Sequence, residues 1–385
     1  MPVKISCFLV LMILASCSSK LVPEKQLRAK AKELADRYII VDGHIDLPEF
    51  LVQENKYRVG VDSPDTLISA GLGEFDYTRA KKGGLDAPFM SIYIPIEYQA
   101  KADNGKGLAD SLIDFVVGVT KVLPDKFALA NTPAEVQANT KAGKISLPMG
   151  MENGAPIGNS LSNVKYFYDR GVRYITLAHN KDNQICDSSR DTTHTHGGLS
   201  AFGKQVVAEM NRVGIIVDIS HVDDQTFYQV MELSKAPAIA SHSSCRKFSP
   251  KAPRDMTDDM IKKLGEKGGV IMINFFTAFL DSTAMKTGGK FDSTHPNPTN
   301  IETVANHIDN VVKIAGIDHV GIGSDFDGVS GSLPVGLEDV SKYPDLIYTL
   351  LKRGYTEEDI EKICYKNAFR VWSKVIDVSK QLQRQ

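Results

Sequence analysis

Two possible metal ligands, His44 and Asp46, stand two residues apart in the stretch "IIVDGHIDLP" (39–48), where an apolar run gives way to polar residues. On an extended chain, side chains at i and i+2 project to the same side, so this imidazole and this carboxylate can bind one divalent cation together. The same pair would also suit the start of a solvated loop. It therefore indicates a metal site only if further ligands come from elsewhere in the chain.

Similar polar residues follow apolar runs at several later points. They are Glu152 in "GMENG", His179 in "LAHN", His221 in "DISH", His242 in "ASHSSC" and Asp325 in "GIGSDFDG". Taken alone, each has an ordinary interpretation: a surface acid, a histidine satisfied by neighbouring backbone, or an aspartate that forms a turn. Their repeated position at the end of an apolar run indicates that they act together.

The residue types in this set indicate metal-assisted hydrolysis. Three histidines and two carboxylates make a plausible ligand shell for two metal ions that share one carboxylate. Nitrogen and oxygen ligands without thiolate favour zinc, with manganese, iron or cobalt as alternatives. Two such ions would hold a bridging hydroxide at neutral pH. Asp325 could then accept the proton of the water, and His179 could donate to an oxygen that becomes negative.

These residues can meet only if the apolar runs are parallel strands of one sheet. Amphipathic segments at 162–171, 199–214 and 256–269 predict helices between such strands. Eight strands alternating with helices favour an α/β fold of the (β/α)8 barrel type over an open doubly wound sheet, and a barrel gathers all strand C-termini on one face. The expected strands span 38–44, 88–95, 144–152, 173–179, 214–221, 236–242, 269–275 and 318–325.

The chain has 385 residues, no internal repeat and no Pro/Gly-rich linker, so we expect one catalytic barrel domain over 37–378. A linker and an N-terminal helix (18–36) should precede it, and a short tail (379–385) should follow. A glycine- and charge-rich insertion at 57–84 is expected to form loops at the barrel mouth. The formal net charge is −2, so nothing indicates a nucleic-acid partner.

The first residues predict export. "MPVKISCFLVLMILASCSSK" carries one early cation and an apolar run from Ile5 to Ala15 that is too short for a permanent transmembrane helix, as in a signal peptide. "LASC" resembles the lipobox of bacterial lipoproteins, in which the cysteine, here Cys17, becomes the lipid-bearing first residue. A plain secretory signal is the alternative. We expect a signal peptide over 1–17 and a lipoprotein of the cell envelope, bound to a membrane through its lipid anchor only.

Blocks spread along the chain resemble one enzyme family. They are "DGHIDLP", "GLDAPFMSIYIP", "MGMENG", "GVRYITLAHN", "GLSAFGKQVVAEMNRVGIIVDISH", "SHSSC", "MTDDMI" and "HVGIGSDFDGV". Their order and number resemble the membrane dipeptidase (renal dipeptidase) family of zinc peptidases, within the amidohydrolase-like barrels, from about residue 36 to about residue 375. The resemblance implies a dinuclear zinc dipeptidase acting on dipeptides with free amino and carboxyl ends, including those with a C-terminal D-residue.

The resemblance also implies the ligands of two zinc ions in each chain. His44 and Asp46 would bind one ion. His221 and His242 would bind the other, and Glu152 would bridge the two.

Substrate contacts follow from the same resemblance. His179 would bind the substrate and steady the oxyanion, and Asp325 would contact the free amino group and transfer protons. Arg254, in "KAPRDMTDDM", would pair with the terminal carboxylate, which its planar guanidinium matches in two parallel hydrogen bonds. Arg246 and Lys247 are rivals for that contact.

The chain departs from the family pattern at the expected pocket wall. Ile45 stands where the family often has asparagine, Glu49 where some members have tryptophan, and Phe276 where some have tyrosine. A tryptophan that the family often has after the histidine corresponding to His179 is missing in "HNKDNQICDSS" (179–189). These differences bear on side-chain preference rather than on the chemistry.

Two other functions stay open. One is an amidohydrolase-type metal hydrolase for another amide, a lactone or a β-lactam. The other is a lipoprotein that binds peptide or metal without turnover, although a pure binder has no need of Asp325 as a proton carrier. Related enzymes are commonly dimers, so a homodimer is expected.

Four further histidines are expected not to bind the metal ions. His194 and His196 lie in a polar loop, and His295 and His307 lie in and after a proline-rich stretch, where His307 falls on a helical pattern.

Overall fold

A computed structural model describes residues 23–385. The expected signal peptide and Cys17 lie outside the described residues. Within the described part of the chain, no helix is both long and apolar enough to cross a membrane.

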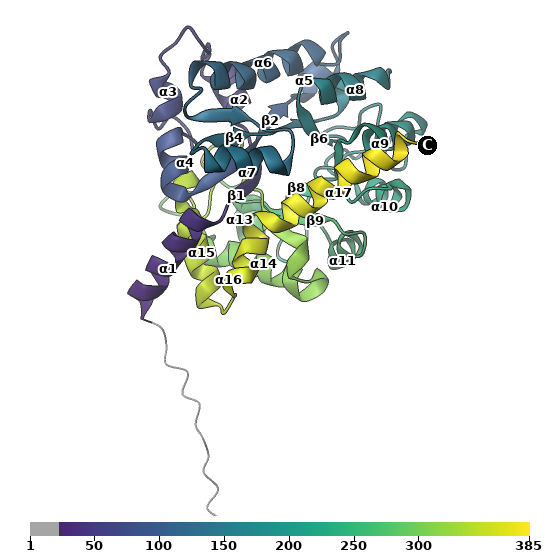
Figure 1. Ribbon diagram of the computed structural model, residues 1–385. Coiled ribbons are helices and arrows are strands. Elements are labelled where there is room, and N and C mark those ends of the chain that lie inside the picture. Colours follow the sequence, from purple (N-terminus) through teal and green to yellow (C-terminus); the bar gives the residue numbers. More distant parts are fainter. Residues whose placement is uncertain (1–22) are drawn as a thin grey trace, which may run out of the picture.

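Eight parallel strands close into a barrel in the order β1-β10-β9-β8-β7-β6-β5-β2, which confirms the predicted fold class (Figure 1). Short, fully buried strands are what a parallel barrel requires, because helices cover its outer face. Each of the eight lies within or overlaps a segment predicted from sequence. The strands are β1 (Ile40–Ile45), β2 (Leu85–Tyr93), β5 (Met149–Glu152), β6 (Val172–Thr176), β7 (Ile216–Asp218), β8 (Ile239–Ser243), β9 (Val270–Ile273) and β10 (Val320–Ile322).

One predicted strand, 144–152, is divided in the structure. Its first part, β4 (Ile145–Leu147), pairs with β3 (Phe127–Leu129) in a separate two-stranded sheet, and only β5 belongs to the barrel. The break falls at Pro148, whose nitrogen carries no hydrogen and so cannot donate to a strand ladder. The apolar run continues across the proline, so the sequence pattern alone did not reveal the break.

The predicted helices are present; three have slightly shorter bounds than the predicted segments, and the N-terminal helix ends one residue beyond its predicted bound. They are α1 (Glu24–Arg37), α8 (Ser162–Asp169), α9 (Ala201–Val213) and α11 (Asp258–Glu266). The insertion at 57–84 contains two short helices, α3 (Asp65–Ile68) and α4 (Tyr77–Gly83), as well as loops, and it reaches the mouth where Glu74 N donates to Asp327 (2.5 Å).

Further helices cover the sheet. They include α6 (Lys106–Val122), α7 (Pro133–Lys141), α10 (Asp224–Leu233), α14 (Ile301–Ala315), α15 (Tyr343–Lys352) and α17 (Asn367–Leu382). The last helix, α17, crosses the molecule diagonally in Figure 1 and continues past residue 378.

Two glycines in the barrel interior allow close packing behind the strand ends. A Cβ on Gly43 would lie 2.4 Å from the carbonyl oxygen of Ser241, and one on Gly150 would lie 1.9 Å from the ring of Tyr174. Any side chain at position 43, between Asp42 and His44, would therefore clash with the neighbouring strand. Gly150 likewise leaves room for a buried tyrosine directly beneath the strand ends.

Candidate metal centre and active site

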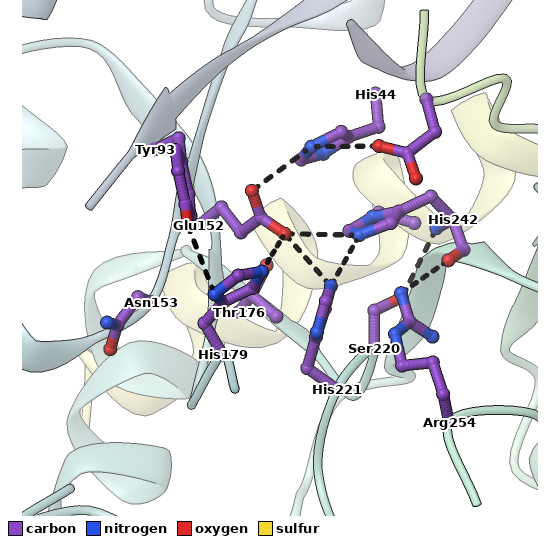
Figure 2. Close-up of polar contacts among 12 residues, drawn as sticks. His44, Tyr93, Glu152, Asn153, Thr176, His179, Ser220, His221, His242 and Arg254 are labelled. Atoms are coloured by element: carbon purple, nitrogen blue, oxygen red, sulfur yellow. Dashed lines mark hydrogen bonds and ion pairs between the residues drawn. The ribbon is translucent and has the colours of Figure 1, made fainter. Parts of the chain in front are cut away.

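The polar residues at the strand ends meet at one mouth of the barrel. Figure 2 shows Glu152 in the middle of a group of imidazoles from separate strands. A cavity of about 860 Å³ opens there, and its lining includes Asp46, Glu152, His179, His221 and Asp325. The structure thus brings to one place residues that the sequence spreads over nearly three hundred positions.

Glu152, the last residue of β5, faces four histidines. Its Oε1 lies 2.9 Å from His221 Nε2, 3.3 Å from His242 Nε2 and 3.6 Å from His179 Nε2. Its other oxygen, Oε2, lies 3.4 Å from His44 Nε2. One carboxylate therefore connects two groups of possible ligands, His44 with Asp46 on one side and His221 with His242 on the other.

Each of these two groups, taken together with Glu152, has its ligand atoms within 4.8 Å of one another. Several of those atoms lack a protein partner: His44 Nε2 and Asp46 Oδ1 are buried and accept or donate no hydrogen bond among the described residues. Buried polar atoms are rarely left unpaired, so this donor set fits a cation. Imidazole nitrogens and carboxylate oxygens without thiolate are consistent with zinc.

Hydrogen bonds behind two of the imidazoles fix which ring nitrogen points to the centre. Tyr174 donates its hydroxyl to Gly43 O (3.0 Å), so it must accept from His44 Nδ1 (2.7 Å). Ser241 donates to Asp218 Oδ2 (2.7 Å), so it must accept from His242 Nδ1 (2.7 Å).

Both rings thereby carry a proton on Nδ1, so Nε2 is the nitrogen that faces the centre and that offers a lone pair whenever the ring is neutral. That lone pair is what a metal ion needs, and partners of this kind behind a ligand histidine orient the ring.

The site's electrostatics favour positive charge at its centre. Burial lowers the pKa of His221 and His242 well below the ordinary histidine value, which keeps both rings neutral. Burial acts to lower the pKa of His44 as well, yet Tyr174 and the nearby carboxylates raise it well above that value. Burial likewise acts to raise the pKa of Glu152, but His179 and His44 hold it well below the ordinary carboxyl value.

Asp325 lies at the same mouth, with its Oδ1 4.0 Å from His44 Nε2. We call His44, Asp46, Glu152, His221 and His242 the Glu152 group; Asp325 stands outside it by this definition, although it forms a further possible cluster with His44 and His242. It has a left-handed backbone (φ 67°) and accepts a hydrogen bond from Asn274 Nδ2 (2.8 Å). Burial raises its pKa to about 7, His44 acts against the rise, and the Asp46 and Glu152 carboxylates add to it. A carboxyl group with a pKa near neutrality can both take up and release a proton.

His179 stands on the loop after β6, three residues beyond the strand end. Its Nδ1 lies 3.5 Å from the Tyr93 hydroxyl and its Nε2 faces Glu152. Burial lowers its pKa, so the ring is neutral at pH 7 and can donate one hydrogen bond.

The family follows from comparison with known proteins. Residues 28–385 match the family model described as membrane dipeptidase, peptidase family M19. The chain belongs to this family of metallopeptidases. It is similar to an uncharacterised dipeptidase of Schizosaccharomyces pombe, with 35% identity over 360 residues that cover 91% of this chain and 84% of the relative.

Two solved structures are similar over nearly their whole length. The probable dipeptidase PvdM from Pseudomonas aeruginosa has a TM-score of 0.80 at 26% identity, covering 93% of this chain and 100% of its own. A metallopeptidase from Rhodobacter sphaeroides, liganded with a phosphinate mimic of the dipeptide L-Ala-D-Ala, has a TM-score of 0.77 at 26% identity, covering 88% of this chain and 99% of its own. The predicted family and enzyme class are confirmed.

Arg254, which the family resemblance singles out, lies beside the centre. It is 4% exposed, and its guanidinium donates to Ser243 Oγ and to His242 O, both at 2.6 Å, while its Nε has no partner among the described residues. The rivals point elsewhere: Arg246 is paired with Asp224, and Lys247 donates to Asn310 (2.9 Å).

The remaining histidines named above lie away from the Glu152 group. His307 is buried, with Nδ1 accepting from Cys245 N and Nε2 donating to Leu280 O, both at 3.0 Å. His196 Nε2 lies 2.8 Å from Asn183 O, and His295 is exposed. His194 is exposed and lies near two aspartates in a separate group.

Four residues with evident structural roles at the site were not singled out from the sequence. Tyr174, Asp218, Ser241 and Asn274 hold His44, His242 and Asp325 in place, yet in the sequence they are unremarkable strand residues. A usable signal existed for one of them: Asp218 is an acid inside an apolar run, shortly before His221, as Asp42 is before His44. Both aspartates are fully buried and accept backbone N–H groups from the neighbouring strand, at Ser241 and at Ser324 respectively.

Proposed function

We propose that this family member is a dinuclear zinc dipeptidase, with His44 and Asp46 at one ion and His221 and His242 at the other. The observation that carries the proposal is the position of Glu152, whose two oxygens face the two ligand groups separately. A carboxylate placed in this way suits two cations a few ångströms apart.

The protein's own residues divide the remaining work. Zinc, when bound, supplies an activated water and polarises the scissile carbonyl. Asp325 is placed to take a proton from the attacking water and to deliver it to the leaving amine, since its pKa is about 7. His179, neutral and at the cavity wall, is placed to donate a hydrogen bond to the carbonyl oxygen as negative charge develops there.

The charges around the cavity suit a short zwitterion. Carboxylates of Glu49 and Asp325 line it and can attract a free amino group. Arg254 lies beside it for a carboxylate, within reach of the strand that carries His242. A substrate held at both ends with the metal centre between them is a dipeptide, and a longer peptide would lose one of the two end contacts. The similar Rhodobacter sphaeroides structure with its L-Ala-D-Ala mimic supports substrates with a C-terminal D-residue.

The decisive experiment combines metal analysis with a dipeptide panel. Purified protein should hold two zinc ions per chain and should cleave L,L- and L,D-dipeptides but not their N-acetylated or C-amidated forms. Chelation should abolish turnover, and added zinc should restore it. If zinc-replete protein cleaves lactones, β-lactams or N-blocked amides but no free dipeptide, the proposed substrate class is wrong.

Asp325→Asn separates an enzyme from a peptide-binding protein. This substitution removes the proton carrier but leaves the Glu152 group intact, so zinc content should be retained while kcat falls by about 10²- to 10⁴-fold. Loss of zinc in Asp325→Asn would instead identify Asp325 as a ligand, since it also lies near His44 and His242.

We also propose that the chain is exported, lipidated at Cys17 and dimeric. The support for export and lipidation is the signal-like segment at 1–17, and the support for a dimer is that related enzymes are commonly dimers. Radiolabelled palmitate should be incorporated by the wild type and not by Cys17→Ala, and light scattering of the protein without its first 22 residues should give the mass of two chains.

A further inference from the structure

Arg190 is a cation on the cavity wall whose guanidinium forms no hydrogen bond or ion pair within residues 23–385. It is exposed and lines the same cavity as Glu152, His179 and Asp325. The ring centre of Phe279 lies 5.4 Å from the guanidinium carbon, and the carboxylates of Asp255 and Asp325 lie close enough to act on its charge without forming an ion pair with it. A guanidinium has five N–H donors in a planar fork, so this side chain is available to a ligand in the cavity.

The backbone around Arg190 is fixed to the metal centre. Ser189 N donates to His221 O (2.8 Å), and Ser188 donates from its hydroxyl to His179 O. On the other side, Asp191 accepts a hydrogen bond from Asp182 N (3.2 Å). Arg190 is therefore carried by a loop that is bonded directly to the segments of two active-site histidines, which holds its Cα at a constant place relative to the reacting bond.

Two guanidinium groups flank one ring on this side of the cavity. Arg254 also lies 5.4 Å from the centre of Phe279, but it is almost fully buried and already bonded to Ser243 and His242. Its unpaired Nε is placed deep, beside β8, where the α-carboxylate of a dipeptide would lie close to the metal centre. Arg190, being exposed, stands further out, where the side chain of the C-terminal residue would extend.

We infer that Arg190 binds a side-chain carboxylate on the C-terminal residue, so that this enzyme selects dipeptides that end in an acidic residue. The inference rests on the proposed dipeptidase function and narrows its substrate class. A charge-assisted bond between guanidinium and carboxylate is stronger than a neutral one, and a polar wall built for it discriminates against a neutral analogue of equal size.

Glutamate and glutamine supply the matched pair of substrates. The value of kcat/KM for Ala-Glu should exceed that for Ala-Gln by about tenfold or more in the wild type, measured with both L- and D-configured C-terminal residues. In Arg190→Gln the ratio should fall to about one, through loss of Ala-Glu cleavage alone. Arg190→Lys should keep part of the preference, because it retains the charge without the fork.

Lys290→Gln is the control, because Lys290 is another exposed cation of the cavity wall and its removal changes the net charge equally. The ratio should be unchanged in this variant, and zinc content and thermal midpoint should be unchanged in all three.

Three results would each overturn the inference. The first is a wild-type ratio near one. The second is an equal loss of cleavage of both substrates in Arg190→Gln, which would place Arg190 at the α-carboxylate, and the third is a ratio that also falls to about one in Lys290→Gln. The dipeptidase function would stand in those cases, whereas it fails if neither dipeptide is cleaved at all.

Discussion

Two groups of histidine and carboxylate in this protein look alike in composition and spacing but differ in the bonds that their atoms already make. One is the Glu152 group at the barrel mouth. The other consists of Asp187, His194 and Asp223, on the loop after β6 and at the start of α10. In both, the possible ligand atoms lie within 4.8 Å of one another.

The difference is in what the atoms already bind. Asp187 accepts hydrogen bonds from the backbone of His196 and Gly198, both at 2.9 Å, and Asp223 caps α10 by accepting from Thr226 N (2.7 Å). His194 leaves 60% of its side chain exposed. At the mouth, by contrast, all five side chains are buried, and His44 Nε2 and Asp46 Oδ1 have no hydrogen-bond partner among the described residues. The Nε2 atoms of His221 and His242 face each other at 2.9 Å beside Glu152. Unpaired, buried lone pairs distinguish a metal centre from a loop that satisfies its own backbone.

Replacing the shared carboxylate should have the largest effect. Glu152→Gln keeps the volume but removes the charge that serves both ligand groups, so both zinc ions should bind far more weakly and turnover should fall on the order of 10³-fold. Metal analysis after gel filtration and kcat/KM at fixed zinc measure this. Glu49→Gln is the matched control, since Glu49 lines the same cavity outside either ligand group and should leave zinc content unchanged. Full zinc occupancy in Glu152→Gln would remove the basis of the comparison.

His307 is a buried histidine outside the Glu152 group, and both of its ring nitrogens are bonded within the protein, so it should resist protonation. Burial lowers the pKa of His307 to about 4, against an ordinary value near 6.5, although its hydrogen bond to Leu280 O and the charge of Asp281 act against the shift. Protonating Nδ1 would also break the bond that Cys245 N donates to it.

The unfolded chain therefore takes up this proton first. The free energy of unfolding contributed by His307 is fully present above pH 6.5 and should be lost as the pH falls towards 4, by about 3 kcal/mol. Urea unfolding of zinc-free wild type and His307→Gln at pH 7 and pH 4.5 tests this. The wild type should lose more stability than the variant between the two pH values, and parallel losses would contradict the assigned pKa.

The partners behind the ligand rings should have a smaller, graded effect. Tyr174→Phe removes the acceptor that fixes the tautomer of His44, so zinc affinity should fall by about 10- to 100-fold while activity at saturating zinc largely returns. Competition with a chelator of known affinity measures it. Tyr166→Phe removes a tyrosine hydroxyl that is bonded to Asp110 away from the mouth and should leave affinity unchanged. An unchanged affinity in Tyr174→Phe would mean that the ring is held by packing alone.

The sequence was sufficient for the barrel and for the residues at its mouth, because both follow from short-range patterns. An apolar run followed by a ligand-type residue recurs at His44, His221 and His242, and parallel strands bring such ends together. It was insufficient where the decisive fact is a contact between distant residues. Tyr174 has the pattern of a core residue, and only the structure reveals its bond to His44.

The same limit explains why the sequence alone does not separate the His194 group from the Glu152 group. From the sequence, "DTTHTHGG" offers His194 near Asp191, with Asp187 shortly before it, as readily as "DGHID" offers His44 beside two acids. Which acids are already bonded depends on the path of the loop, and that path is set by hydrogen bonds that backbone N–H groups donate to Asp182, Asp187 and Asp191. Pro148 is the reverse case, in which a local signal was present but the apolar run around it dominated.

The smallest effect, and the sharpest test of the comparison, is expected at His194. His194→Ala removes the exposed ring while Asp187 and Asp223 keep the backbone hydrogen bonds that already satisfy them. Zinc content should stay at two ions per chain, and kcat/KM should not change. The free energy of unfolding should change by no more than about 0.5 kcal/mol, as read from the thermal midpoint. Loss of one bound ion from His194→Ala, with turnover retained, would mean that carboxylates satisfied by backbone can still recruit a cation, and the criterion that separates the two groups would fail.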